Sequence, residues 1–314
     1  MANVLSALMP VFLVIALGAV LKRVLLQEDT HWVALERLSY YVLFPALLVV
    51  NIARADLGGV AVLEVCVALL GAIALMSAGL WLARPALCRA LRLDGPGFTS
   101  VFQGAVRWNT YVGLAVAGGL AGPAGLAVAA VGLAVMIPAL NTLSVITLAR
   151  HGHNAAPGLR RIGLQVVRNP FIWSCAAGAA INAFHLPVPP VIVTFGDILG
   201  RASLALGLLV VGAGLRLGDL RRPRAATWVA SVLKLAVLPA LAVAIGVWWR
   251  LAGVDLLIVA VAAAVPSAPN GYVLARQMGG DAPLLAEMLT VQTLAAAVTM
   301  PLVIAAIEII QKHI

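Results

Sequence analysis

Residues 256–275, LLIVAVAAAVPSAPNGYVLA, form the stretch that decides the fold. The stretch is apolar on both sides of a central Pro-Ser-Ala-Pro-Asn-Gly, and about 20 such residues cross a bilayer as a helix. Pro266 and Pro269 remove two backbone donors near mid-span, and Gly271 loosens the same turn. In hydrocarbon, the freed backbone groups must be satisfied by protein or by a water-filled cavity. The stretch therefore predicts a membrane helix broken at a functional site.

The composition of the whole chain indicates an all-α polytopic membrane protein. The 314 residues are 63% apolar and 11% charged, with a mean hydropathy of +1.05. Soluble domains are about 45–50% apolar and about 25% charged. These values exclude a soluble enzyme, a disordered chain and a secreted disulfide scaffold.

Apolar runs of helix length recur along the whole chain, and we predict ten transmembrane helices from them. The predicted helices span residues 4–21, 38–52, 57–82, 98–120, 124–148, 170–184, 191–215, 226–249, 256–275 and 284–310. No Lys or Arg precedes the first run, so we expect that run to be a permanent span rather than a signal peptide.

The loop charges predict the orientation of the chain. Alternate loops, starting with Lys22 and Arg23, hold fourteen Lys and Arg residues besides Arg37, which lies directly before the second predicted helix, whereas the opposite loops hold three. Because basic residues accumulate on the cytoplasmic side, we expect both termini on the non-cytoplasmic side of the cytoplasmic (inner) membrane. Since the basic clusters stand between apolar runs, we attribute the net charge of +9 to topology and not to nucleic-acid binding.

Two halves of the chain share a pattern. Asn109 and Asn270 are each followed by a residue and then Tyr-Val, and they lie 161 residues apart, while Pro10 and Pro170 lie 160 apart. The pattern predicts a five-helix repeat over 1–148, a cytoplasmic linker over 149–168 and a second repeat over 169–314. Five is odd, so the repeats are inverted, which is typical of secondary transporters. Chance matching in apolar sequence is the alternative.

Polar residues inside two of the predicted helices suggest an anion site. Broken helices end in free N–H groups with a partial positive charge, and two such ends meeting at mid-membrane bind anions. Arg107 lies deep in helix 98–120, where a charge is usually functional, although an arginine also reaches the headgroups by snorkelling. The predicted substrate-binding residues are Asn109, Asn270, Arg107, Thr110 and Ser267, and the predicted helix-break residues are Pro266, Pro269, Gly113 and Gly271.

Candidates for ion coupling are fewer. Glu64 and Glu287 lie near span ends, where hydration costs little, and Lys234 is expected to snorkel toward the cytoplasmic headgroups. For Asp197 we expect a local ion pair with Arg201, one helical turn away. The lack of a mid-span acid weakens the case for a cation antiporter. No metal-ligand spacing or nucleophile–base pair is present, so we expect no cofactor, no metal and no enzymatic activity.

Several stretches resemble the auxin efflux carrier family of membrane transporters, in its bacterial branch, and are similar to the plant PIN-FORMED auxin carriers. They are 38–47 (LSYYVLFPAL), 102–109 (FQGAVRWN), 169–171 (NPF), 233–235 (LKL) with Pro239, and 265–270 (VPSAPN) with Tyr272. The resemblance implies ten helices in two inverted repeats, with the fourth and ninth helices crossing at the midplane. It also implies a scaffold and a transport domain, each built from both repeats, and carboxylate substrates. It carries the crossing asparagines over onto Asn109 and Asn270.

From these observations we predict a secondary transporter (an efflux carrier or permease) for a small organic anion, a carboxylate in the first place, working by alternating access. A proton- or sodium-coupled antiporter, or a cation carrier on the same fold, is the alternative. The expected partners are the organic anion and membrane lipids, with no nucleic acid, and a homodimer is left open.

Overall fold

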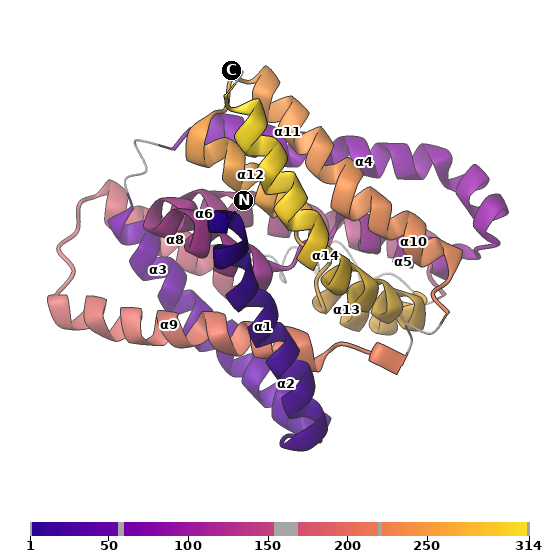
Figure 1. Ribbon diagram of the computed structural model, residues 1–314, viewed down its shortest axis with the longest axis horizontal. Coiled ribbons are helices and arrows are strands. Elements are labelled where there is room, and N and C mark those ends of the chain that lie inside the picture. The colour runs from indigo at the N-terminus through magenta and orange to yellow at the C-terminus, as the bar shows by residue number, and fades with distance from the viewer. Residues whose placement is uncertain (1, 56–59, 154–168, 219–221, 313–314) are drawn as a thin grey trace.

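The computed structural model describes residues 2–55, 60–153, 169–218 and 222–312, and these residues contain helices and no strands (Figure 1). The α-helices are α1 (Ala2–Val24), α2 (Asp29–Leu38), α3 (Phe44–Arg54), α4 (Val62–Leu91), α5 (Gly95–Val106), α6 (Thr110–His151), α8 (Pro170–Ala183), α9 (Pro190–Ala213), α10 (Ala225–Val232), α11 (Leu238–Trp248), α12 (Gly253–Ala264), α13 (Asn270–Met278) and α14 (Ala282–Ile310). Two π-helical segments, η1 (Ser39–Leu43) and η4 (Leu233–Val237), join α2 to α3 and α10 to α11.

Several helices are long and apolar enough to cross a membrane, which makes this a multi-pass membrane protein. Within the described ranges, six stretches meet that criterion by length and composition: 29–54, 62–91, 95–151, 190–213, 225–248 and 282–310. The stretch 95–151 is interrupted at residues 107–109, and α6 is kinked where Ala121 and Gly122 leave helical geometry. The ten-helix inverted repeat stays a prediction.

The second predicted helix starts nine residues earlier than its apolar run suggested. The start at Leu38 was wrong, because α2 begins at Asp29 and continues through η1 into α3. Asp29 pairs with Lys22, and the buried Trp32 donates its Nε1–H to the carbonyl of Leu26 at 2.6 Å. These contacts stabilise a first turn that is too polar to be recognised by hydropathy.

Each π-helical segment ends two residues before a proline. Pro45 and Pro239 have no N–H to donate, and one residue earlier the backbone N–H reaches back five residues instead of four. In η1 the N–H of Phe44 bonds to the carbonyl of Ser39. Such widened turns often mark functional positions in helices, and they shift the side chains of the η segments around the helix axis.

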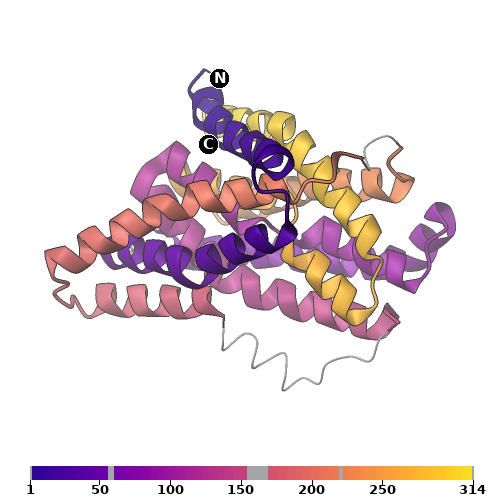
Figure 2. The same ribbon diagram turned by 90° about the horizontal axis from the view of Figure 1, so that it is seen from below.

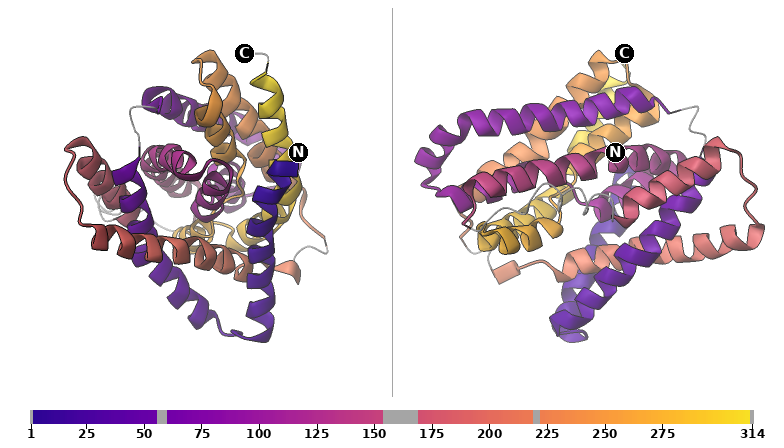
Figure 3. Two further views of the ribbon diagram at one scale, coloured as in Figure 1. Left: turned by 60° about the vertical axis from the view of Figure 1, so that its left-hand side comes forward. Right: turned by 180° about the vertical axis from the view of Figure 1, so that it is seen from behind.

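The helices pack in two groups (Figures 1 and 2). The first group consists of α1, α2–η1–α3, α8 and α9, and the second consists of α4, α5, α6, α10–η4–α11, α12, α13 and α14. The groups meet mainly where α6 contacts α1, α3, α8 and α9, and where α1 lies beside α14 (Figure 3). Both groups draw helices from both halves of the chain.

Glycines hold the first group together. A Cβ on Gly212 of α9 would lie 1.8 Å from the carbonyl oxygen of Ile15 on α1, and a Cβ on Gly18 would lie 2.1 Å from that of Leu209. The backbones of α1 and α9 are therefore in direct contact. Small residues at such crossings favour helix association in lipid, where no hydrophobic effect drives it.

Candidate substrate-binding site

The first helix break separates α5 from α6. The α5 helix ends at Val106, Arg107 is extended, and α6 begins at Thr110. Asn109 caps α6, because its Oδ1 accepts hydrogen bonds from the backbone N–H groups of Tyr111 and Val112 at 3.1 and 3.3 Å. Asn109 therefore closes the start of a helix with its oxygen and keeps its side-chain amide N–H groups as donors.

The second break separates α12 from α13. The α12 helix ends at Ala264, and α13 begins at Asn270 after the two prolines, with Pro269 in the cap position and no side-chain cap. Asn270 is exposed and lies one residue inside its helix, whereas Asn109 lies one residue before its own. The two asparagines are therefore close to equivalent but differ by one position.

Hydrogen bonds join the two breaks. The N–H of Asn109 donates to the carbonyl of Pro266 at 2.9 Å. The carbonyl of Gly104 accepts from Ser267 Oγ at 2.7 Å and from Gln292 Nε2 at 2.9 Å. Through these contacts the protein satisfies backbone groups that the breaks release inside the membrane. Ser267, predicted to bind substrate, is buried in this network and does not line the cavity described below.

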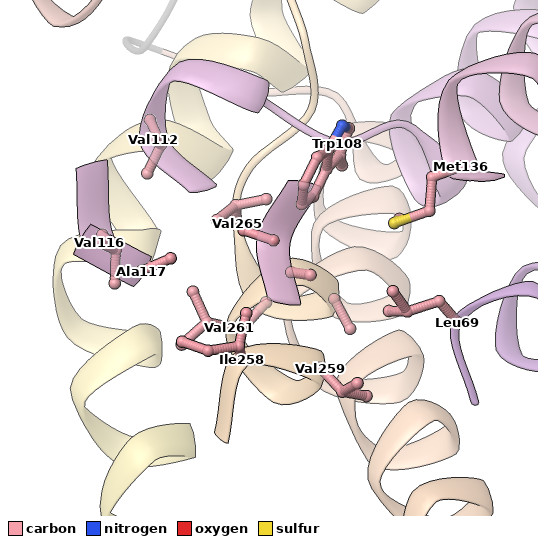
Figure 4. Close-up of a cluster of buried hydrophobic side chains, with 14 of the residues drawn as sticks. Leu69, Trp108, Val112, Val116, Ala117, Met136, Ile258, Val259, Val261 and Val265 are labelled. Carbon is pink, nitrogen blue, oxygen red and sulfur yellow. The ribbon is translucent and has the colours of Figure 1, made fainter. Parts of the chain in front are cut away.

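Apolar side chains pack around the same crossing. Trp108 from the first break and Val265 from the second belong to one buried cluster with residues of α4, α6 and α12 (Figure 4). Gly113 and Gly271, predicted as break residues, lie inside α6 and α13 instead. Each makes room for a neighbour, because added Cβ atoms would lie 3.2 Å from the Trp108 ring and 3.0 Å from Arg107 Cδ. Their small size serves packing rather than the break.

A cavity of about 310 Å³ opens beside the two breaks, between the two helix groups. The first group contributes α2, η1 and α8 to its wall, and the second contributes α6, the residues around both breaks, and α13. The lining residues are Glu36, Arg37, Tyr40, Tyr41, Arg107, Asn109, Thr110, Tyr111, Asn141, Val145, Phe171, Ala268, Pro269, Asn270, Val273, Leu274 and Gln277. The starts of α6 and α13 both lie in this lining.

Arg107 is the buried charge of the cavity. Its side chain is 4% exposed, and its Nη2 donates to Asn141 Oδ1 at 2.7 Å. Its Nη1 is buried with no hydrogen-bond partner, and no carboxylate of the described ranges lies within 4.0 Å. A buried guanidinium with an unused donor is costly unless an anion completes it. The snorkelling alternative is not what the structure shows, because the side chain is directed at Asn141.

Aromatic rings form another part of the cavity lining. Tyr40 contacts Tyr41 and Phe171 edge to face, with ring centroids 4.9 and 5.0 Å apart. Tyr111 stacks on Phe44 at 4.8 Å. The η1 turn presents Tyr40 and Tyr41 side by side, and α8 supplies Phe171. The cavity thus combines a cationic end with an aromatic face, an arrangement suited to a carboxylate that carries an apolar body.

Glu36 is a cavity residue that the sequence analysis missed. Its carboxylate is half-buried and forms no ion pair or hydrogen bond with the described residues. The misplaced start of the second helix left this residue in a supposed loop. The sequence did contain a signal for this residue: Glu36 and Arg37 lie within one helical turn of Tyr40 and Tyr41.

The predicted coupling residues lie outside the cavity. Glu287 is buried rather than hydrated, since Arg224 Nε contacts its Oε2 at 3.0 Å and Thr227 Oγ1 contacts its Oε1 at 2.6 Å. Glu64 is half-buried near the start of α4. Neither residue lines the cavity.

Lys234 does not snorkel. Its side chain is fully buried, and its Nζ donates to the carbonyl of Ala263 at 2.6 Å, in the last turn of α12. The reason is that η4 turns the side chain inward toward the negative end of a broken helix. The expected Asp197–Arg201 pair is also wrong, because Asp197 pairs with Arg54 of α3 at 3.2 Å.

The described part of the chain holds no cluster of three or more His, Cys, Asp or Glu residues placed to bind a metal ion. A helical membrane protein with paired helix breaks at a cavity between two helix groups has the architecture of a membrane transporter. Known proteins agree at this level. Residues 158–304 match a family model described as membrane transport protein. The chain is also 27% identical to an uncharacterized transporter of Methanothermobacter thermautotrophicus over 308 residues, which cover 95% of this chain and 96% of the relative.

Proposed function

We propose that this protein is a secondary transporter for a small organic anion, a carboxylate in the first place. The observation that carries the proposal is the half-paired, buried Arg107 in the wall of the cavity. The starts of α6 and α13 lie in the same wall, so the partial positive charges of two helix N-termini act on the same space.

The binding mode follows from the donors that are free. A carboxylate in the cavity would accept from Arg107 Nη1, whose partner is missing. The side-chain amides of Asn109 and Asn270 and the hydroxyl of Thr110 supply further donors at the two helix starts. The aromatic face of Tyr40 and Phe171 would contact the apolar part of the substrate.

The position of the cavity supports alternating access. Its wall is made by both helix groups, so a displacement of one group against the other would open and close it. Under the predicted topology, the lining residues Glu36, Asn141, Phe171 and Gln277 all lie in the half of the membrane that is next to the cytoplasm. We therefore propose that the structure is an inward-facing state of the cycle.

An ion-coupled antiporter or cation carrier is the second candidate, and Glu36 is the observation that favours it. An unpaired carboxylate in a cavity attracts a cation or a proton. Arg107 and the two helix starts act against a cation at the same place. We therefore rank a cation substrate below an organic anion.

A thermal-shift screen of the purified protein tests the proposal. Acetate, malonate, malate and benzoate would be compared with their neutral amides at several sodium concentrations. A ligand at about 100 times its Kd stabilises the folded state by about 2.7 kcal/mol. We expect at least one carboxylate to stabilise the protein. Its neutral amide should bind with at least tenfold lower affinity and give a smaller thermal shift. Equal effects of acid and amide, or stabilisation by cations alone, would contradict an anion site.

A further inference from the structure

We propose that Glu36 takes up a proton when the cavity binds its organic anion, so that one proton accompanies each substrate through the transport cycle. The inference rests on the proposed anion substrate. It concerns a residue that donates no hydrogen bond to the substrate carboxylate in the binding mode proposed above. It assigns the step that couples transport to a proton gradient.

The first argument is the place of Glu36. The residue lines the same 310 Å³ cavity as Arg107, but from the opposite helix group, on α2. Its carboxylate is half-buried and receives no hydrogen bond from the described residues. A carboxylate that stays ionised inside a protein normally has a basic partner or several hydrogen-bond donors. Glu287 shows what such a carboxylate looks like in this protein, because Arg224 and Thr227 both contact it.

The second argument is the set of charged and titratable groups around Glu36. On α2 itself, Arg37 is exposed at the cavity and forms no ion pair. The segment η1 contributes the phenols of Tyr40 and Tyr41. The helix α9, which packs against α2, carries Asp197 and Arg201 as its charged residues. Asp197 is bound to Arg54, and Arg201 is exposed.

Across the cavity, two further groups face the carboxylate. Arg107 is held by Asn141 and is not within ion-pair distance of Glu36. The phenol of Tyr111 lines the same cavity as Glu36. Glu36 is thus an acid that shares a small space with the anion site and has no fixed counter-charge.

The third argument is the charge balance of the loaded cavity. A carboxylate substrate brings a second negative charge into the space that already holds Glu36. At an effective dielectric constant of about 20, two such charges about 6 Å apart weaken binding about a hundredfold. A proton removes this repulsion and turns the Glu36 side chain into a hydrogen-bond donor.

The step balances as follows in atoms and charge. As the anion enters, one proton passes from bulk water to a carboxylate oxygen of Glu36, and no other bond changes. On the far side the anion leaves, and the same proton returns to water. For a monocarboxylate, the cavity therefore moves no net charge relative to its empty state with ionised Glu36.

Binding measured as a function of pH tests the inference. The purified full-length protein, the Glu36→Gln variant and a Glu28→Gln control would be titrated with the tightest binder among acetate, malonate, malate and benzoate. Glu28 is exposed, lies just before α2, and is outside the cavity. We expect the wild-type affinity to fall about tenfold per pH unit on the alkaline side of the Glu36 titration. Glu36→Gln should bind tightly at every pH, and Glu28→Gln should follow the wild type.

Proton uptake on binding supplies a second readout that needs no variant. A pH indicator in lightly buffered solution should report close to one proton per bound anion for the wild type at alkaline pH. An affinity that does not change with pH, or no proton uptake, would overturn the role of Glu36 and leave the anion site intact. If none of the four carboxylates binds any of the three proteins, the proposed function itself fails, and this inference falls with it.

Discussion

The two helix breaks interrupt their membrane helices by different chemistry. At the first break the chain has no proline, and Asn109 caps the new helix while a cation, Arg107, faces the cavity. At the second, two prolines open the chain, α13 has no side-chain cap, and the nearby cation, Lys234, is bound to the carbonyl of Ala263. One buried cation thus keeps an unpaired donor, Arg107 Nη1, and the other binds a carbonyl at a helix end.

The difference teaches that burial within the protein does not decide what a charged side chain does. Arg107 and Lys234 are almost equally buried, at 4% and 0% exposure. Lys234 Nζ has a hydrogen-bond partner within the protein, because the end of α12 offers a carbonyl with a partial negative charge. Arg107 Nη1 has no hydrogen-bond partner and Arg107 lines the cavity, so a bound anion would complete it. The missing partner is therefore the better guide to function.

The largest effect is expected from Arg107→Gln. Loss of the guanidinium should reduce affinity for the best carboxylate by more than about a hundredfold, because hydrogen bonds to charged groups are the strongest in such sites. Thermal stability without ligand should hold or rise, since a poorly paired buried charge is removed. Isothermal titration and thermal unfolding on one preparation measure both. Arg201→Gln, on an exposed face, is the control, and unchanged affinity in Arg107→Gln would contradict the comparison.

Lys234→Met should have the opposite pattern. Methionine keeps the length of the side chain but leaves the carbonyl of Ala263 without its donor, which costs about 1–3 kcal/mol of stability. Carboxylate affinity should stay within about threefold of wild type, because Lys234 does not line the cavity. Thermal unfolding followed by ligand titration separates the two effects. A large loss of affinity with normal stability would place Lys234 in the site and remove the contrast between the two cations.

The two asparagines should separate in the same way, with a smaller effect. Asn270→Ala removes an exposed donor in the cavity and should lower affinity about tenfold at nearly unchanged stability. Asn109→Ala also removes a helix cap, so it should lower stability by about 1 kcal/mol in addition. Both quantities are read from thermal shifts with and without the ligand. Equal stability losses in the two variants would mean that both asparagines have the same structural role.

The smallest effects are expected from the glycines beside the breaks. In Gly271→Ala the new methyl group meets Arg107 Cδ, so the guanidinium should shift and affinity should fall about threefold. In Gly113→Ala the methyl group meets the Trp108 ring, which does not touch the binding space, so affinity should hold. A competition assay with a labelled carboxylate resolves changes of this size. Matching losses in both variants would show that the strain spreads across the whole crossing.

The sequence predicted the features that follow from local chemistry. Pro266 and Pro269 marked the second break because they remove backbone donors, and Arg107 stood out because a charge deep in an apolar run is costly. The hydrogen-bond partners of the buried cations could not be predicted from the sequence, because these contacts depend on packing between distant segments. Asn141, which holds Arg107, follows it by 34 residues, and Ala263 follows Lys234 by 29.

The largest omission has a different cause. Glu36 was overlooked because the polar first turns of α2 hide a helix from a hydropathy reading, and a residue in a loop is not considered as part of a membrane cavity. The aromatic part of the cavity could not be predicted from the sequence either, because Tyr40 contacts Phe171 only through the packing of η1 against α8.

The contact of α1 with α9 through Gly18 and Gly212 has a consequence for what the substrate experiences. Two backbones in direct contact leave little room to slide or rotate, so we expect the first group to keep its shape if the two groups are displaced against each other. Arg107 and the starts of α6 and α13 belong to the second group, whereas Tyr40 and Phe171 belong to the first. In the proposed cycle, a displacement of the groups would therefore move the charged end of the cavity relative to its aromatic face.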